Sequence, residues 1–154
     1  MKTLQIVNFD KRYAKDFEAL NTQWLAKYFY VEEYDKQVLS NPEEYIIRKG
    51  GHIFMATIEG KAIGTVALIN RDNNTFELSK MAVEEEAQGM RIGQKLMYYA
   101  INFAGENNID RLFLDSNTIL KPAISLYKKV GFKEIPVPKN TPYERCNIRM
   151  ELMI

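Results

Sequence analysis

The sequence predicts an α/β fold in which one mixed, six- to seven-stranded sheet carries helices on both faces, and three observations support this prediction. Segments rich in β-forming residues alternate with segments whose apolar residues recur at helical spacing. The strands expected at Thr75–Val83 and Arg111–Ser116 are joined through a long helix, so they should run parallel. No repeat, low-complexity tract or Gly/Ser linker interrupts the chain, so we expect a single domain over residues 1–154.

The N-terminal half predicts a strand, two helices and a meander of three strands. A short strand at Leu4–Asn8 precedes a long helix and then a shorter one at Glu33–Leu39. The apolar positions of the long helix are Tyr13, Phe17, Leu20, Trp24 and Tyr28. The β-rich segments that follow, separated by turns at Glu59-Gly60 and Asp72-Asn73-Asn74, are His52–Ile58, Lys61–Asn70 and Thr75–Val83.

The C-terminal half predicts a helix, a strand, a second helix and a terminal pair of strands. The first helix should end near Asn107, and its apolar stripe consists of Ile92, Leu96, Tyr99, Ala100 and Phe103. After the strand at Arg111–Ser116, Pro122 suits the first turn of the next helix and Gly131 suits its left-handed end. The last strand is expected at Cys146–Leu152.

Charge and cysteine content exclude several classes of partner. The 21 basic and 20 acidic side chains nearly cancel, so we expect neither a nucleic acid nor a membrane surface as partner. Cys146 is the single cysteine, and Met1–Arg12 has no continuous apolar core of a signal peptide, which together favour the cytoplasm. No set of side chains has metal-ligand spacing, and the one histidine, His52, is expected to have no catalytic role.

One segment between a strand and a helix is suited to bind phosphate. Gln88–Gly93 contains two glycines, which let the backbone approach a ligand closely. The first amides of the following helix lack internal acceptors and lie at the positive end of its dipole, so an anion is their natural partner. Arg91 could add a charged contact. By itself the pattern is also compatible with an ordinary strand-to-helix turn.

This segment resembles the cofactor loop of the GNAT superfamily of N-acetyltransferases, Gln/Arg-x-x-Gly-x-Gly/Ala. Gln88 and Gly93 match the two ends, whereas Arg91 stands where the pattern has its middle glycine. The second signature of that superfamily matches more specifically. It reads Asn-x-x-Leu-x-x-Ala-Ile-x-Leu-Tyr-x-x-x-Gly-Phe, and the segment Asn117–Phe132 agrees with it at every defined position.

The resemblance implies an N-acetyltransferase that moves an acetyl group from acetyl-CoA to a primary amine in a ternary complex, without a metal. In such proteins the strand before the loop diverges from its parallel neighbour, and the pantetheine arm enters the V-shaped gap. Here the gap would lie between Thr75–Val83 and Arg111–Ser116. The implied cofactor-binding residues are Met81, Ala82, Val83, Gln88, Gly89, Met90, Arg91, Ile92, Gly93, Gln94, Asn117, Ala123, Tyr127 and Lys129.

Two residues receive catalytic roles from the resemblance. Tyr127 would protonate the departing thiolate, since the ordinary pKa values of a tyrosine hydroxyl, about 10, and of a thiol, about 8.5, make that transfer nearly balanced. Glu77 would take the proton of the acceptor amine, with Glu151 and Tyr143 as substitutes. The backbone of Met81–Val83 would stabilise the oxyanion.

The sequence leaves the acceptor and the exact activity open. The first two helices and the late loops offer aromatic residues and carboxylates that suit a cationic amine, whereas Arg145 suits an acceptor with its own carboxylate. We therefore expect a small-molecule or peptide amine, and a monomer or homodimer. The alternatives are a regulatory module that binds acyl-CoA without catalysis, or a transferase for another acyl group. The candidate acceptor-site residues are Trp24, Tyr28, Phe29, Tyr30, Glu32, Glu33, Tyr34, Asp35, Tyr143 and Arg145.

Overall fold

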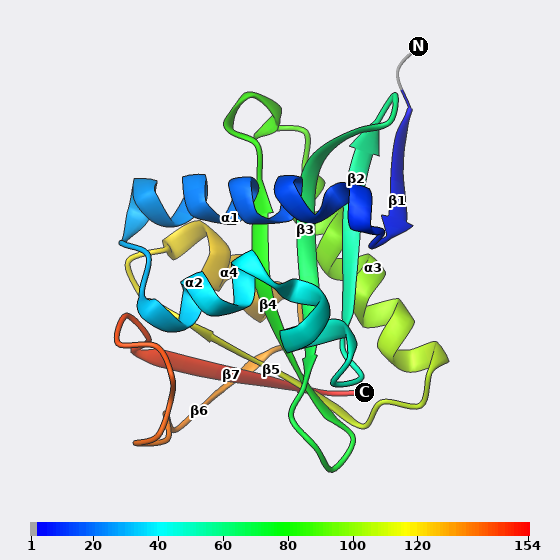
Figure 1. Cartoon of the computed structure of the whole chain (residues 1–154). Helices are drawn as coiled ribbons and strands as arrows, with labels where there is room; N and C mark the ends of the chain where they lie inside the picture. Colours follow the sequence, from blue (N-terminus) through cyan, green and yellow to red (C-terminus); the bar gives the residue numbers. More distant parts are fainter. Residues whose placement is uncertain (1–2) are drawn as a thin grey trace.

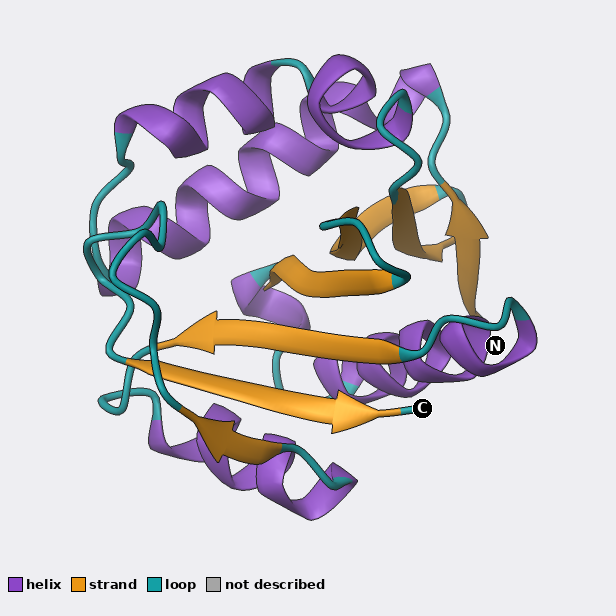
Figure 2. Ribbon diagram, turned by 90° about the horizontal axis from the view of Figure 1, so that it is seen from below, coloured by secondary structure: helices purple, strands orange, loops and turns teal. Residues whose placement is uncertain are grey.

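The computed structural model describes residues 3–154 as one mixed sheet between two helical layers (Figures 1 and 2). The helices are α1 (Ala14–Tyr28), α2 (Glu33–Ser40), α3 (Ile92–Glu106) and α4 (Lys121–Val130), with short helical turns at Lys11–Tyr13, Glu43–Ile47 and Glu85–Ala87. The strands are β1 (Leu4–Asn8), β2 (His52–Ile58), β3 (Lys61–Asn70), β4 (Thr75–Val83), β5 (Arg111–Ser116), β6 (Lys133–Ile135) and β7 (Ile148–Met153).

The seven strands follow the order β1-β2-β3-β4-β5-β7-β6, and the predicted α/β fold is confirmed. The pair β4–β5 is parallel, as the helix between the two strands requires, and the other neighbours are antiparallel. Helices α1 and α2 cover one face, and α3 and α4 cover the other (Figure 1). The alternation of β-rich and helical periodicity in the sequence is therefore sufficient to predict this layered arrangement.

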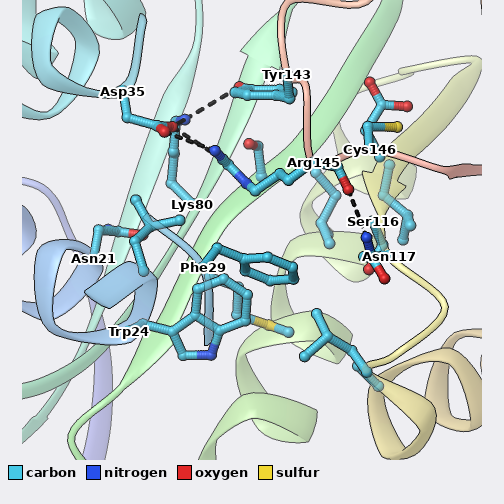
Figure 3. Close-up of a pocket in the computed structure, with 18 of the residues that line it drawn as sticks. Asn21, Trp24, Phe29, Asp35, Lys80, Ser116, Asn117, Tyr143, Arg145 and Cys146 are labelled. Carbon is cyan, nitrogen blue, oxygen red and sulfur yellow. Dashed lines mark hydrogen bonds and ion pairs between the residues drawn. The ribbon is translucent and has the colours of Figure 1, made fainter. Parts of the chain in front are cut away.

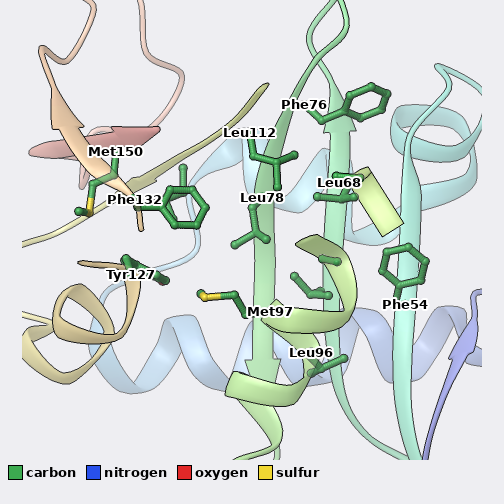
Figure 4. Close-up of a cluster of buried hydrophobic side chains, with 14 of the residues drawn as sticks. Phe54, Leu68, Phe76, Leu78, Leu96, Met97, Leu112, Tyr127, Phe132 and Met150 are labelled. Carbon is green, nitrogen blue, oxygen red and sulfur yellow. The ribbon is translucent and has the colours of Figure 1, made fainter. Parts of the chain in front are cut away.

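Apolar side chains form a separate core on each face of the sheet. The core under α3 and α4 includes Leu96, Met97 and Leu112, all fully buried, together with Tyr127 and Phe132 (Figure 4). The core under α1 and α2 is built on other side chains of the same strands, such as Met55 and Ala67. The core under α3 and α4 therefore contacts both β4 and β5, the two strands between which the sheet opens.

Strand β4 contains a β-bulge that changes the direction of its side chains. Lys80 has a left-handed φ of 53°, and the register with β3 shifts between Thr65 and Ala67 at this point. Lys80 reaches α2, where its Nζ lies 3.1 Å from Asp35 Oδ1, whereas Met81 packs against the α3 core. The bulge thus puts a lysine into the layer between β4 and α2.

The predicted V-shaped gap is present between β4 and β5. The two strands pair only where Thr75–Glu77 face Arg111–Phe113, and beyond that point they have no mutual register. Backbone groups of Leu78–Val83 that point toward β5 consequently have no partner strand. This opening provides the cavity in which the candidate site is built.

Candidate active site

The opening between β4 and β5 leads into a cavity of about 170 Å³ (Figure 3). Its walls come from five parts of the fold: the second half of α1, α2, the diverging ends of β4 and β5, α4 with the turn before it, and the loop before β7. The lining residues are Asn21, Trp24, Leu25, Phe29, Asp35, Leu78, Ser79, Lys80, Met81, Leu114, Asp115, Ser116, Asn117, Leu120, Ala123, Tyr127, Tyr143, Arg145 and Cys146. The cavity therefore brings Tyr127 together with candidate acceptor residues from α1, α2 and the late loop.

Tyr127 lies at the α4 side of this cavity with 9% of its surface exposed. Helix α4 orients it, because Pro122 begins the helix and Gly131 ends it with a left-handed φ of 115°. Its ring meets Phe132 edge-on at a centroid distance of 6.1 Å. Burial raises the pKa of Tyr127 to about 12, against a smaller opposing effect of Ser116. The hydroxyl is therefore a firmly protonated hydrogen-bond donor at neutral pH.

A buried cluster of charges centred on Asp35 lies across the cavity from Ser116 and Asn117 (Figure 3). Asp35 has no exposed surface and accepts hydrogen bonds from Lys80 at 3.1 Å and from Arg145 at 2.7 and 3.0 Å. Arg145 also pairs with Glu32 at 2.8 Å. Lys80 additionally donates to the hydroxyl of Tyr143 at 3.1 Å. Three parts of the chain, the start of α2, β4 and the loop before β7, are thus held together here.

Opposing effects act on the pKa of Asp35. Burial alone would raise it, but the hydrogen bonds from Arg145 and the charge of Lys80 outweigh burial and lower the pKa of Asp35 below its usual value of 3.8. The amide of Glu32 also donates to Oδ2 of Asp35, at 3.0 Å, as part of a capping box at the start of α2. Asp35 is therefore an ionised structural centre with its acceptor capacity in use.

The Gln88–Gly93 loop lies at the start of α3, as the sequence predicts. The amides of Gly89 and Arg91 have no backbone acceptor within residues 3–154, and the first turn of α3 follows directly. A side chain at Gly89 would meet nothing within 4 Å, so its surroundings are open. Glu84 and Glu85 pair with Lys61 and Lys27, which offsets carboxylates that would repel an anion here.

Arg91 occupies a left-handed conformation with φ of 58° at the N-cap of α3. Glycine adopts this conformation without a steric penalty, which explains why the resembling pattern has glycine there. We predict that Arg91→Gly raises the free energy of unfolding by up to about 1 kcal/mol, measured by urea denaturation. Gly89→Ala, at a φ of 96°, should lower it. A loss of stability in the Arg91 variant would contradict this account and point to a stabilising contact of the guanidinium.

Glu77 lies in a second hollow and does not line the cavity that contains Tyr127. Its Oε1 accepts two hydrogen bonds from Arg71, at 3.0 and 2.7 Å, and only 2% of the residue is exposed. Glu151, its proposed substitute, pairs with Arg111 at 2.6 Å. Tyr143, the other substitute, does line the main cavity. The structure thus separates two of the three candidate bases from Tyr127.

The remaining residues singled out from the sequence lie partly inside and partly outside the cavity. Asn117 lines the cavity, but its side chain is engaged in the local turn: it donates to the carbonyl of Arg145 at 2.8 Å and accepts from the amide of Ile119 at 3.0 Å. Lys129 is exposed on α4. His52 packs against aromatic rings on the α3 side, with 4.5 Å between the ring centroids of His52 and Phe103. Across residues 3–154, no group of His, Cys, Asp or Glu could hold a metal ion.

The family follows from comparison with known proteins. The model of the acetyltransferase (GNAT) family matches residues 17–132. The chain belongs to this family. It is 32% identical over 101 residues to N-acetylaspartate synthetase of Xenopus tropicalis, and 30% identical over 101 residues to the probable N-acetyltransferase camello of the same organism. These alignments cover 64% of this chain, but only 37% and 46% of the two relatives.

Solved structures share this fold over nearly the whole chain. The GNAT acetyltransferase of Staphylococcus aureus Mu50 superposes with a TM-score of 0.87 at 25% identity, covering 98% of this chain and 99% of that one. PaiA N-acetyltransferase of Thermoplasma acidophilum, solved in complex with coenzyme A, shares the fold with a TM-score of 0.76 at 19% identity, covering 99% of each chain. The fold of these structures agrees with the place of this chain in the GNAT family. Within the part of the chain that the structure describes, no helix has the length and hydrophobicity needed to cross a membrane.

Proposed function

We propose that this GNAT protein transfers an acetyl group from acetyl-CoA to a primary amine by direct attack in a ternary complex. The observation that carries the proposal is the cavity between β4 and β5, since it is lined at one end by Tyr127 and at the other by the charged cluster around Asp35. One cavity thus contains both a hydrogen-bond donor for the leaving group and charged residues that could bind the acceptor. This combination favours catalysis over a regulatory module that only binds acyl-CoA.

The residues of the chain fit acetyl-CoA at three places. The free amides of Gly89 and Arg91 and the start of α3 suit the pyrophosphate. The backbone of Met81–Val83, which has no partner strand toward β5, suits the pantetheine arm. Exposed Lys129 suits the 3′-phosphate. Acetyl-CoA, when bound, supplies an activated thioester as the acetyl donor.

Two groups of the chain act on the reacting atoms in this proposal. Backbone amides of Met81–Val83 stabilise the negative charge that develops on the carbonyl oxygen. Tyr127 donates to the departing sulfur; because its pKa of about 12 exceeds that of a thiol, hydrogen-bond donation contributes more than complete proton transfer. Cys146 lines the cavity, but direct attack by the amine requires no covalent bond to it.

Glu77 remains the proposed base. If it accepts the proton of the amine through water, Glu77→Gln should lower kcat by about 10²- to 10⁴-fold. Arg71→Gln, which breaks the same ion pair from the other side, is the matched control for structural damage. Equal losses in the two variants would remove Glu77 from the role of base and leave Tyr143 as the candidate within the cavity.

Release of free thiol from acetyl-CoA with a panel of amino acids, polyamines, amino sugars and peptides tests the proposal. We expect acceptor-dependent release with at least one class, and propionyl-CoA and succinyl-CoA in the same assay rank the acyl groups. Tight CoA binding without release on a broad panel would support the regulatory module. We also propose that the protein is located in the cytoplasm, because a single cysteine cannot form an intramolecular disulfide.

A further inference from the structure

Two distant segments of the chain are tied together at the charged end of the cavity. Tyr30, after α1, donates to Glu144 in the loop before β7 at 2.7 Å. Glu32 accepts from the amide of Glu144 at 3.0 Å and from Arg145 at 2.8 Å. The same two segments carry Phe29 and Arg145, which line the cavity. These contacts therefore fix the two segments that supply Phe29 and Arg145 to the cavity.

The carboxylates that line the cavity have almost no capacity left for a cationic ligand. The two oxygens of Asp35 accept four hydrogen bonds, from Lys80, from Arg145 twice and from the amide of Glu32. A carboxylate has about four lone-pair sites, so Asp35 is saturated. Asp115 accepts two bonds from Arg149 and one from Thr141.

The cations that line the cavity, in contrast, keep unused donors. Arg145 uses Nη1 and one Nη2 hydrogen on Asp35 and Glu32, and its Nε–H has no acceptor within residues 3–154. Lys80 uses two of its three N–H donors, on Asp35 and Tyr143. The unused hydrogen-bonding groups of these charged residues are therefore N–H donors, and N–H donors suit an anionic group of the ligand.

We propose that the acceptor is a small amine that carries a carboxylate, with the carboxylate bound by Arg145 and Lys80 and the amine directed toward the gap between β4 and β5. This inference rests on the acetyltransferase activity proposed above and adds the class of acceptor. The cavity volume of about 170 Å³ is small for a ligand site, which favours a small amine over a peptide chain.

Matched acceptors test this inference on the wild-type protein. Glycine and β-alanine are each compared with the corresponding amide, with the amine that lacks the carboxyl group, and with a short peptide that begins with the same residue. We expect the free acids to show at least about tenfold higher kcat/KM, because a charged hydrogen bond is lost in each analogue. The amide has the more acidic ammonium group, so intrinsic amine reactivity acts against this order.

A substitution then assigns the preference to a residue. Arg145→Lys keeps the charge beside Asp35 but removes the planar fork of donors, so the preference for the free acid should fall several-fold, mainly through KM. Arg48→Gln, in an exposed pair with Glu44, serves as the control and should leave the preference unchanged. Cofactor-dependent thermal stabilisation shows that each variant is folded.

The results separate the two proposals. Equal or better use of amides, simple amines or peptides would overturn the carboxylate inference and leave the acetyltransferase proposal intact. A preference that survives Arg145→Lys unchanged would also overturn the assignment to this residue. If no acceptor of any kind releases thiol, the proposed function fails, and the inference fails with it. The wild-type ranking decides the class of acceptor even if the Arg145 variant does not fold.

Discussion

Replacing Tyr127 with phenylalanine is expected to lower kcat by about 10²-fold or more while leaving the affinity for CoA nearly unchanged. The substitution removes one hydroxyl and keeps the ring that packs against Phe132 in the core. The loss would therefore fall on the step in which sulfur departs with negative charge. Steady-state thiol release gives kcat, and calorimetric titration of CoA gives the affinity.

Tyr143→Phe provides the matched control for this experiment. Tyr143 is also buried and lines the same cavity, but its hydroxyl accepts from Lys80 at the charged end. We expect its removal to affect KM for the acceptor more than kcat. If Tyr127→Phe lowers CoA affinity as much as turnover, or if both tyrosine variants behave alike, Tyr127 is not the donor to the leaving group.

The second large effect concerns stability. Asp35→Asn should lower the free energy of unfolding by about 3–5 kcal/mol, because Lys80 and Arg145 would lose their shared counter-charge in a buried place. Urea denaturation followed by circular dichroism measures this change. The control is Glu44→Gln, which breaks an exposed pair with Arg48 and should change stability by less than about 0.5 kcal/mol.

The effect of Asp35→Asn on the free energy of unfolding should depend on pH. Since the pKa of Asp35 is lowered in the folded state, its ionised form stabilises the protein above the usual value of 3.8, and this contribution is lost as the pH falls through the lower folded value. The stability difference between wild type and Asp35→Asn should therefore be constant near neutral pH and shrink in strong acid. A difference that grows on acidification would contradict the role of Asp35 as an ionised centre.

Particular residues show why the fold could be predicted from the sequence. Strand and helix periodicity placed β4, β5 and the helices between and after them within one or two residues, because apolar patterning reflects burial directly. The last strand begins at Ile148 and not at Cys146, since the Cys146 amide closes a turn onto Tyr143. The short helical turn at Glu43–Ile47 has no distinct periodicity and was not predicted.

The candidate site was less predictable than the fold. Tyr127 and the loop at Gln88–Gly93 come from local signatures, which sequence can show. Lys80 was missed, although a lysine inside the apolar strand Phe76–Val83 is a signal that a buried partner exists elsewhere in the chain. Its partner, Asp35, is 45 residues away, and only the bulge in β4 turns Lys80 toward it.

The ion pairs of Arg71 and Arg145 could not be predicted from the sequence either. Their effect is to engage carboxylates that appeared free: Glu77 is held in the second hollow, and Asp35 is saturated. Charge balance within a site depends on which side chains meet in three dimensions. For this reason the sequence could suggest both a cationic and a carboxylate-bearing acceptor, whereas the geometry favours the second.

The most direct test of this account is the mass of the product. Purified protein is incubated with acetyl-CoA and an equimolar mixture of amino acids, their amides and the corresponding simple amines, and both small molecules and intact protein are analysed by mass spectrometry. We predict an N-acetylated free amino acid in amounts equal to the CoA released, with no acetylated protein intermediate. The account would be contradicted if the protein binds CoA but forms no acetylated amine, and if the Tyr127→Phe variant behaves in the same way.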